Sequence, residues 1–332
     1  MGENLYFQWH ITDACNFRCR HCYQQDFTGA SDLALDGLIK VYENIASCAG
    51  GRKTRINVTG GEPFLRKDLL SLLRYLDSHD TTEELSIITN ASLIDEGLLE
   101  RLKRIKKLRR LKISLDGATE RTNDFIRKAG AFRTALEKIN LIQEKGALEV
   151  IVMLTAMRSN AYELPAVFNL CREMKVEGLI IERFIPLGQS KDLKSEVISK
   201  EDWKRLIREI FEYMEIDASE NDMLPCKAFW IKFKEDDMEL LGAECNLGDD
   251  AFAVMPNGDL LPCRRFAMKI GNLLDKSLKD IVNESRVLKE VTDKSKLKGK
   301  CATCSIDRCR GCRAFAYAVE NDYLAEDSLC WL

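Results

Sequence analysis

Residues 55–89, RINVTGGEPFLRKDLLSLLRYLDSHDTTEELSIIT, contain the alternation that decides the fold. Arg55–Thr59 and Leu85–Thr89 are short, rich in β-branched residues, and predict strands. Lys67–Ser78 lies between them and has apolar residues at helical spacing, which predicts an amphipathic helix. A strand, a helix and a second strand in this order are typical of a parallel βαβ unit.

The same alternation extends on both sides of this unit, from Trp9 to Met214. Six β/α units result, fewer than the eight of a closed TIM barrel, so we expect an α/β fold with a partial (β/α)6 TIM barrel at residues 9–214. In such folds the chemistry lies at the carboxyl ends of the strands. The other predicted strands are Trp9–Thr12, Leu111–Leu115, Glu149–Thr155 and Leu179–Ile185. The other predicted helices are Leu35–Ser47, Asp95–Lys106, Phe132–Lys145, Glu163–Lys175 and Lys200–Met214.

The remaining segments are interpreted in three parts. Residues 1–8 (MGENLYFQ) resemble an expression tag with a protease site, and we exclude them from the predicted fold. Residues 215–244 are irregular and acidic and predict a bridge between two domains. Residues 245–332 predict a small cysteine-rich domain, in which an Asn-Gly turn favours a β-hairpin. Its expected elements are strands Ala251–Met255 and Leu260–Cys263 and helical sequence at Leu278–Val291.

Composition excludes several classes of protein. The chain has 332 residues and a net charge of −3, which gives no support to nucleic-acid binding. No apolar run approaches the roughly 20 residues that span a bilayer, so we expect a cytoplasmic protein without membrane contact. Disulfide-dense chains are usually small and secreted, so the 13 cysteines favour metal binding in a reducing compartment.

Three of these cysteines lie just after the first predicted strand. Cys15, Cys19 and Cys22 have the spacing C-x3-C-x2-C. Thiolates are soft ligands that suit zinc or iron–sulfur clusters. Three cysteines would leave one iron of a [4Fe–4S] cluster open to a substrate or cofactor, whereas zinc would need His21 or His10 as its fourth ligand.

A second motif, Gly60-Gly61-Glu62-Pro63, follows the next predicted strand directly. Glycines there allow a ligand to approach the backbone closely. A carboxylate and exposed backbone groups at this strand end could hold an amine. Alone, this motif is also typical of an ordinary β/α turn.

Together, CNFRCRHC at residues 15–22 and TGGEP at residues 59–63 resemble the radical S-adenosylmethionine (SAM) superfamily. The resemblance implies that the open iron chelates SAM and that one electron cleaves SAM to methionine and a 5′-deoxyadenosyl radical, which abstracts hydrogen. It also implies that Gly60, Gly61, Glu62 and Pro63 contact the SAM amino group. The other SAM-site residues that it implies are His21, Asn90, Ser114, Arg127 and Ile185.

Seven more cysteines lie in the last 88 residues, enough for one complete four-cysteine centre and one with three. Their pattern resembles the SPASM extension of radical SAM enzymes, which carries two auxiliary [4Fe–4S] clusters. The gaps around the third cysteine of the tail, x4 and x2, are shorter here than the usual x5 and x3. The resemblance implies a distal set, Cys301, Cys304, Cys309 and Cys330, and a proximal set nearer the barrel, Cys245, Cys263 and Cys312.

Three cysteines remain outside this scheme of three [4Fe–4S] clusters. Cys48 and Cys171 lie in apolar-patterned helices, where free cysteine behaves as a small hydrophobe. Cys226 has three readings: a loop thiol, a fourth ligand of the proximal cluster, or a catalytic thiol that donates a hydrogen atom. If Cys226 is not recruited, one proximal iron stays open.

Radical SAM enzymes with SPASM domains mostly act on peptides, so our leading hypothesis is a maturase of a ribosomally made peptide. Its product would be a thioether, a carbon crosslink or an epimer. Alternatives are a tetrapyrrole- or cofactor-modifying enzyme, an anaerobic sulfatase maturase, and a non-enzymatic iron–sulfur electron-transfer protein. Arg264 stands where sulfatase maturases commonly have an aspartate, which disfavours that alternative.

The expected partners follow from the same resemblance. They are a peptide substrate, reduced ferredoxin or flavodoxin as electron donor, and a separate leader-peptide-binding protein. The basic segment Arg101–Lys112 is either a solvated face or a docking patch for such an acidic partner.

Overall fold

The computed structural model describes residues 4–146, 148–233, 237–307 and 309–332. One curved sheet runs through the described chain in the order β11-β10-β9-β1-β2-β3-β4-β5-β6-β7-β8. β1 to β6 are parallel, β7 pairs antiparallel with β6, and β8 pairs antiparallel with β7. The strands are β1 Asn4–His10, β2 Lys53–Thr59, β3 Thr82–Thr89, β4 Leu108–Ser114, β5 Glu149–Ala156, β6 Gly178–Arg183, β7 Cys226–Phe233, β8 Met238–Glu244, β9 Ala251–Val254, β10 Asp259–Leu261 and β11 Gly271–Asn272. The predicted partial barrel is confirmed, and the sheet is not closed.

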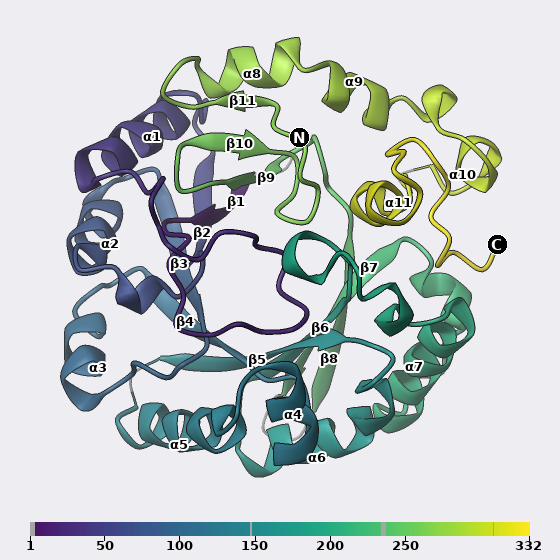
Figure 1. Cartoon of the computed structure of the whole chain (residues 1–332), viewed down its shortest axis with the longest axis horizontal. Helices are drawn as coiled ribbons and strands as arrows, with labels where there is room; N and C mark the ends of the chain where they lie inside the picture. The colour runs from purple at the N-terminus through teal and green to yellow at the C-terminus, as the bar shows by residue number, and fades with distance from the viewer. Residues whose placement is uncertain (1–3, 147, 234–236, 308) are drawn as a thin grey trace.

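Helices cover the outside of the curved sheet (Figure 1). The loop after β1, drawn in purple, crosses the mouth of the barrel. The helices are α1 Leu35–Ser47, α2 Leu69–Ser78, α3 Glu96–Leu102, α4 Glu120–Ile126, α5 Ala131–Glu144, α6 Leu164–Glu173, α7 Lys200–Tyr213, α8 Leu278–Glu284, α9 Arg286–Thr292, α10 Lys300–Thr303 and α11 Arg313–Glu320. Single 3-10 turns lie at Pro63–Leu65, Ala161–Glu163, Gly188–Ser190, Lys194–Glu196, Glu220–Met223 and Lys294–Lys296.

Helix α7 illustrates how the sequence forms these outer elements. Ser199 caps its first turn by accepting a hydrogen bond from the backbone N–H of Asp202. Trp203, Leu206 and Ile210 recur at helical spacing and are buried against the sheet. The apolar stripe predicts the helix because one face must leave water.

The first strand begins earlier than the sequence predicts. Excluding residues 1–8 from the fold is wrong for residues 4–8, which form most of β1. Leu5 and Phe7 are 2% and 1% exposed, and residues 6–9 pair in parallel with β9. The alternating apolar residues of this segment therefore form a strand of the sheet between β2 and β9.

The predicted irregular bridge, residues 215–244, is also corrected. It contains β7 and β8, apart from residues 234–236, which lie outside the described part of the chain. Phe229 and Ile231 alternate into the core at 1% and 0% exposure. The acidic residues of this segment obscured that period-two pattern.

The cysteine-rich domain has more helix than its sequence predicts. The helical segment at Leu278–Val291 divides into α8 and α9 at Ser285, whose hydroxyl accepts a hydrogen bond from Leu288 N at 3.2 Å and so starts a new helix. Helices α10 and α11 of this domain, and α4 of the barrel, are not predicted from the sequence.

The structure describes all 13 cysteines, and none of them forms a disulfide. No described helix is long and apolar enough to cross a membrane.

Candidate functional site

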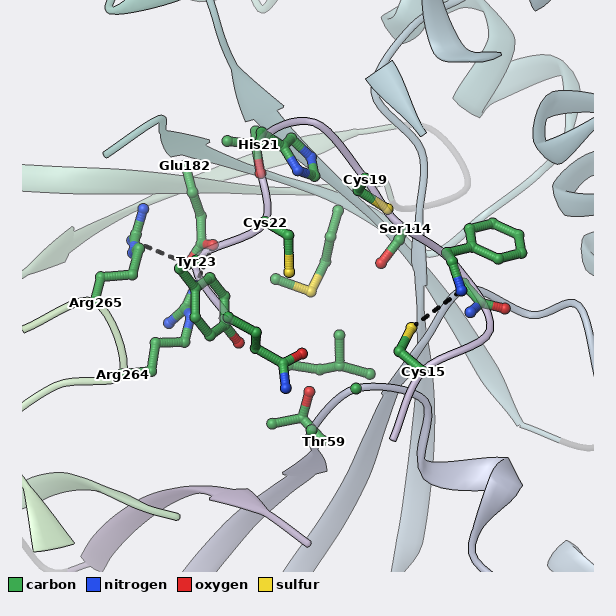
Figure 2. A pocket seen from close by; sticks show the side chains of 18 of the residues that line it. Cys15, Cys19, His21, Cys22, Tyr23, Thr59, Ser114, Glu182, Arg264 and Arg265 are labelled. Atoms are coloured by element: carbon green, nitrogen blue, oxygen red, sulfur yellow. Dashed lines mark hydrogen bonds and ion pairs between the residues drawn. The ribbon is translucent and has the colours of Figure 1, made fainter. Parts of the chain in front are cut away.

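The loop after β1 places three thiols at one cavity. Cys15, Cys19 and Cys22 line an open cavity of about 960 Å³ at the carboxyl ends of the parallel strands. Figure 2 shows them on one side of this space, with Glu182, Arg264 and Arg265 on the other.

The environment of these thiols fits ligands of a cluster. Burial raises the pKa of Cys15, that of Cys19 to about 11 and that of Cys22 to about 12, and Arg127 only partly opposes this for Cys19. Such thiols stay protonated and unreactive unless a metal centre brings its own positive charge. The residues present therefore fit an iron–sulfur cluster, which when bound supplies an electron to SAM.

The zinc alternative does not fit the same residues. Among the residues that the structure describes, no three Cys, His, Asp or Glu side chains could hold one metal ion together. A four-iron cluster keeps its thiolates further apart than a single ion does. His21 Nε2 lies 2.6 Å from Asp116, and His10 Nε2 lies 3.4 Å from the hydroxyl of Tyr23, so these contacts leave only Nδ1 of each ring as a possible ligand.

Two glycines dock the cluster loop onto the end of β2. Gly61 N donates to Thr12 O at 2.8 Å. A Cβ on Gly60, whose φ is +146°, would lie 2.2 Å from Thr12 O, and one on Gly61 would lie 2.2 Å from Ala14 O. Both positions therefore need glycine because the two backbones touch. The crowding comes from the cluster loop itself, although both glycines also line the cavity.

Glu62 faces the barrel wall, not the cavity. It is fully buried, and its carboxylate accepts hydrogen bonds from Thr89 Oγ1 at 2.8 Å and Asn90 N at 2.9 Å. Burial raises its pKa to about 7, against these hydrogen bonds. Neither Glu62 nor Pro63 is among the described residues that line the cavity. Glu62 joins the ends of β2 and β3, and a direct contact with SAM stays a prediction.

Asp116 is the hub that fixes the other side of the loop. It is fully buried after β4, with Oδ2 lying 2.6 Å from His21 Nε2 and 2.7 Å from Arg127 Nη2. Its Oδ1 accepts a hydrogen bond from Thr155 N at 2.8 Å. Burial alone would raise the pKa of Asp116, but Arg127 and then His21 outweigh it and hold the pKa at about 2.

Most residues predicted to contact SAM do meet at this cavity, and the sequence also missed some that matter. Asp116 is not among the predicted site residues, because sequence does not distinguish a buried carboxylate from a turn residue. Arg265 was not singled out, because its contact with β6 depends on the hairpin that carries it. The predicted residues that line the cavity are His21, Gly60, Gly61, Asn90, Ser114, Arg127 and Ile185.

The hairpin of β9 and β10 brings two arginines into the cavity wall. Arg264 pairs with Glu182 and donates to Gln8 Oε1 at 2.7 Å. Arg265 donates to Arg183 O at 2.5 Å and lies 3.5 Å from Glu182. Burial alone would raise the pKa of Glu182, but Arg264 and then Arg265 hold it at about 2.

The structure brings together members of each C-terminal set of cysteines. The thiols of Cys312 and Cys263 lie close enough to Cys245 to raise its pKa, which burial above all brings to about 12. The distal set lines a second cavity, of about 870 Å³. Its cysteines are Cys301, Cys304, Cys309 and Cys330.

The three remaining cysteines lie in or against the hydrophobic core. Cys171 is 1% exposed in α6, and Cys48 is half-buried at the end of α1. Cys226 begins β7 and packs over Gly242 of β8, where a Cβ would lie 2.2 Å from its Sγ. Cys226 is not among the described residues that line the first cavity, so its catalytic role stays a prediction.

Comparison with known proteins identifies the class of enzyme. The Radical SAM superfamily matches residues 9–171, and the SPASM iron–sulfur cluster-binding domain matches residues 245–313. The chain belongs to the radical SAM superfamily and carries a SPASM domain. It is a radical SAM enzyme that binds an iron–sulfur cluster and SAM.

Individual relatives add detail. AdoMet-dependent heme synthase of Methanosarcina barkeri is 26% identical over 97% of this chain and 95% of the relative. Fe-coproporphyrin III synthase of the same organism is 30% identical over 61% of this chain and 50% of that protein.

Solved structures show the same fold at low identity. Streptococcus suis SuiB bound to S-adenosylmethionine has a TM-score of 0.73 at 17% identity, covering 99% of this chain and 77% of that one. anSMEcpe with bound AdoMet and Cp18Cys peptide has a TM-score of 0.75 at 19% identity, covering 98% of this chain and 94% of that one.

Replacing Asp116 with Asn is expected to destabilise the protein by about 3–5 kcal/mol, because the buried guanidinium of Arg127 loses its counter-charge. Chemical unfolding measures this loss. Glu120→Gln is the control, since Glu120 and its partner Arg133 are 46% and 79% exposed, and such pairs contribute less than about 1 kcal/mol. Equal effects of the two substitutions would contradict the role of Asp116 as a hub.

Proposed function

We propose that this enzyme uses SAM-derived radical chemistry on a carboxylated tetrapyrrole. The observation that carries the proposal is the cavity itself, in which the cluster loop faces two arginines across one open space. The heme synthase relative supports it, because the similarity extends over nearly the whole of both chains.

The charges of the cavity wall favour an anionic substrate. Arg127 is neutralised by Asp116, and Arg183 by Asp327. Glu182 is shared by Arg264 and Arg265, which leaves one guanidinium charge in excess among the described groups. Tetrapyrroles carry several carboxylates on an apolar ring, and a guanidinium binds a carboxylate through paired N–H donors.

Arg265 is the better placed of the two arginines for this contact. Its Nε is buried and has no hydrogen-bond partner among the described residues. Such a donor costs free energy until it is satisfied. A substrate carboxylate on Arg265 would satisfy it and orient the ring toward the cluster side of the cavity.

Different parts of the protein have different roles in the proposed reaction. Asp116, Gly60 and Gly61 hold the cluster loop in position. SAM and the cluster, when bound, supply the radical that takes a hydrogen atom from a substrate C–H bond. We propose that the auxiliary sets hold two further [4Fe–4S] clusters, which would exchange an electron with the site.

This proposal replaces the peptide maturase as our leading hypothesis for the function. The structures with bound peptides are below 20% identical to this chain and support only the fold. A tetrapyrrole enzyme needs no leader-peptide-binding partner. We still expect a small reduced electron carrier as donor and a reducing compartment, the cytoplasm, for its free thiols.

Anaerobically reconstituted enzyme with dithionite, SAM and Fe-coproporphyrin III is expected to form 5′-deoxyadenosine and to change the mass of the tetrapyrrole. Liquid chromatography with mass spectrometry measures both products. The variant with Cys15, Cys19 and Cys22 replaced by Ala should form neither. 5′-Deoxyadenosine with an unaltered tetrapyrrole would contradict the substrate class while leaving the radical chemistry intact.

Arg265→Met is expected to weaken binding of Fe-coproporphyrin III by about 10- to 100-fold, the usual loss for a hydrogen bond to a charged group. Titration of the tetrapyrrole absorbance band measures the affinity. Lys269→Met is the matched control, because Lys269 follows the same hairpin but is 55% exposed and pairs with Asp259. An Arg265→Met affinity equal to that of the control would contradict the proposed carboxylate contact.

A further inference from the structure

The distal cysteine set lies beside a lysine from the barrel sheet. Lys227, in β7, lines the cavity of Cys301, Cys304, Cys309 and Cys330. Its side chain is 13% exposed, and its Nζ lies 3.8 Å from Cys309 Sγ. Nζ also donates to Leu224 O at 2.9 Å, which fixes the direction of the ammonium group.

This lysine belongs to a buried set of ion pairs between the two cysteine sets. Lys227 Nζ lies 3.8 Å from Asp327 Oδ2, and Asp327 is fully buried. Asp327 Oδ2 accepts a hydrogen bond from the backbone N–H of Cys312 at 2.9 Å. Arg183, at the end of β6, lies 3.2 Å from the same carboxylate and also lines the first cavity.

A second buried cation, Arg313, also contacts the distal set. Arg313, 1% exposed in α11, has Nη2 at 3.5 Å from Cys301 Sγ. Its other terminal nitrogen donates to Tyr323 O and Ala325 O at 2.9 and 2.6 Å. The distal thiols therefore receive two charge-assisted donors, from Lys227 and Arg313.

Nearby cations and hydrogen bonds to sulfur set the reduction potential of an iron–sulfur cluster. Reduction adds one negative charge to the cluster, and a positive charge within a few ångströms favours that state most where water is excluded. Lys227 is the more informative of the two donors, since Arg313 also holds backbone carbonyls in place.

We propose that Lys227 is a positioning residue for the distal auxiliary cluster, raising its reduction potential through the hydrogen bond to Cys309. The distal centre is thereby favoured to accept and hold an electron. This inference rests on the proposed distal cluster and does not depend on the identity of the substrate.

The test is a redox titration followed by electron paramagnetic resonance. It uses the full chain with Cys15, Cys19 and Cys22 replaced by Ala, so that only auxiliary centres give signals. Lys227→Met is expected to lower the equilibrium constant for reduction of one centre at least tenfold, about 59 mV for one electron, with dithionite as reductant. Lys227→Arg should keep a potential close to that of the parent.

Lys298→Met is the matched control, because Lys298 is 64% exposed and pairs with Asp322. If Lys227→Met loses iron, Lys227→Gln, which keeps a donor without the charge, should still lower the potential. An unchanged potential with about eight irons per chain would overturn this inference alone. About four irons per chain in the parent would overturn the distal cluster and this inference together.

Discussion

The buried carboxylate of Asp116, in contact with Arg127 and His21, makes the interaction on which the site depends. A fully buried carboxylate is costly to desolvate, and the contacts with Arg127, His21 and the N–H of Thr155 offset that cost. The carboxylate follows β4, whereas His21 lies between two cluster cysteines. The position of the cluster loop is therefore fixed by the sheet.

The opposite side of the loop is held by close backbone contact. Gly60 and Gly61 let the end of β2 touch residues 12–14 with no side chain between them. Glu62 then secures the end of β2 to that of β3. The cysteine loop is thus held by the ends of three neighbouring strands, β2, β3 and β4.

The SPASM domain is joined to the barrel by the same sheet. β9 pairs with β1, so the hairpin that carries Cys263, Arg264 and Arg265 continues the barrel wall. Arg264 and Arg265 pair with Glu182 of β6 in the wall of the cavity. One continuous sheet therefore places the cluster loop and the two arginines around the same cavity.

The sequence predicts the parallel sheet well, because hydrophobic periodicity is a local signal. It fails where a residue's role depends on distant partners. The place of residues 4–8 in the sheet depends on β9, which is far away in the sequence. The role of Asp116 depends on His21 and Arg127, and the burial of Glu62 depends on Thr89 and Asn90.

The central claim, that the radical formed at this cavity acts on a tetrapyrrole, has one direct test. Fe-coproporphyrin III deuterated at its carbon-bound hydrogens is incubated with the reduced enzyme and SAM, and the 5′-deoxyadenosine is analysed by mass spectrometry. We predict deuterium in the 5′-deoxyadenosine, because the proposed radical takes its hydrogen atom from a C–H bond of the bound tetrapyrrole. 5′-Deoxyadenosine without deuterium, formed while the tetrapyrrole is present in excess, would contradict the account.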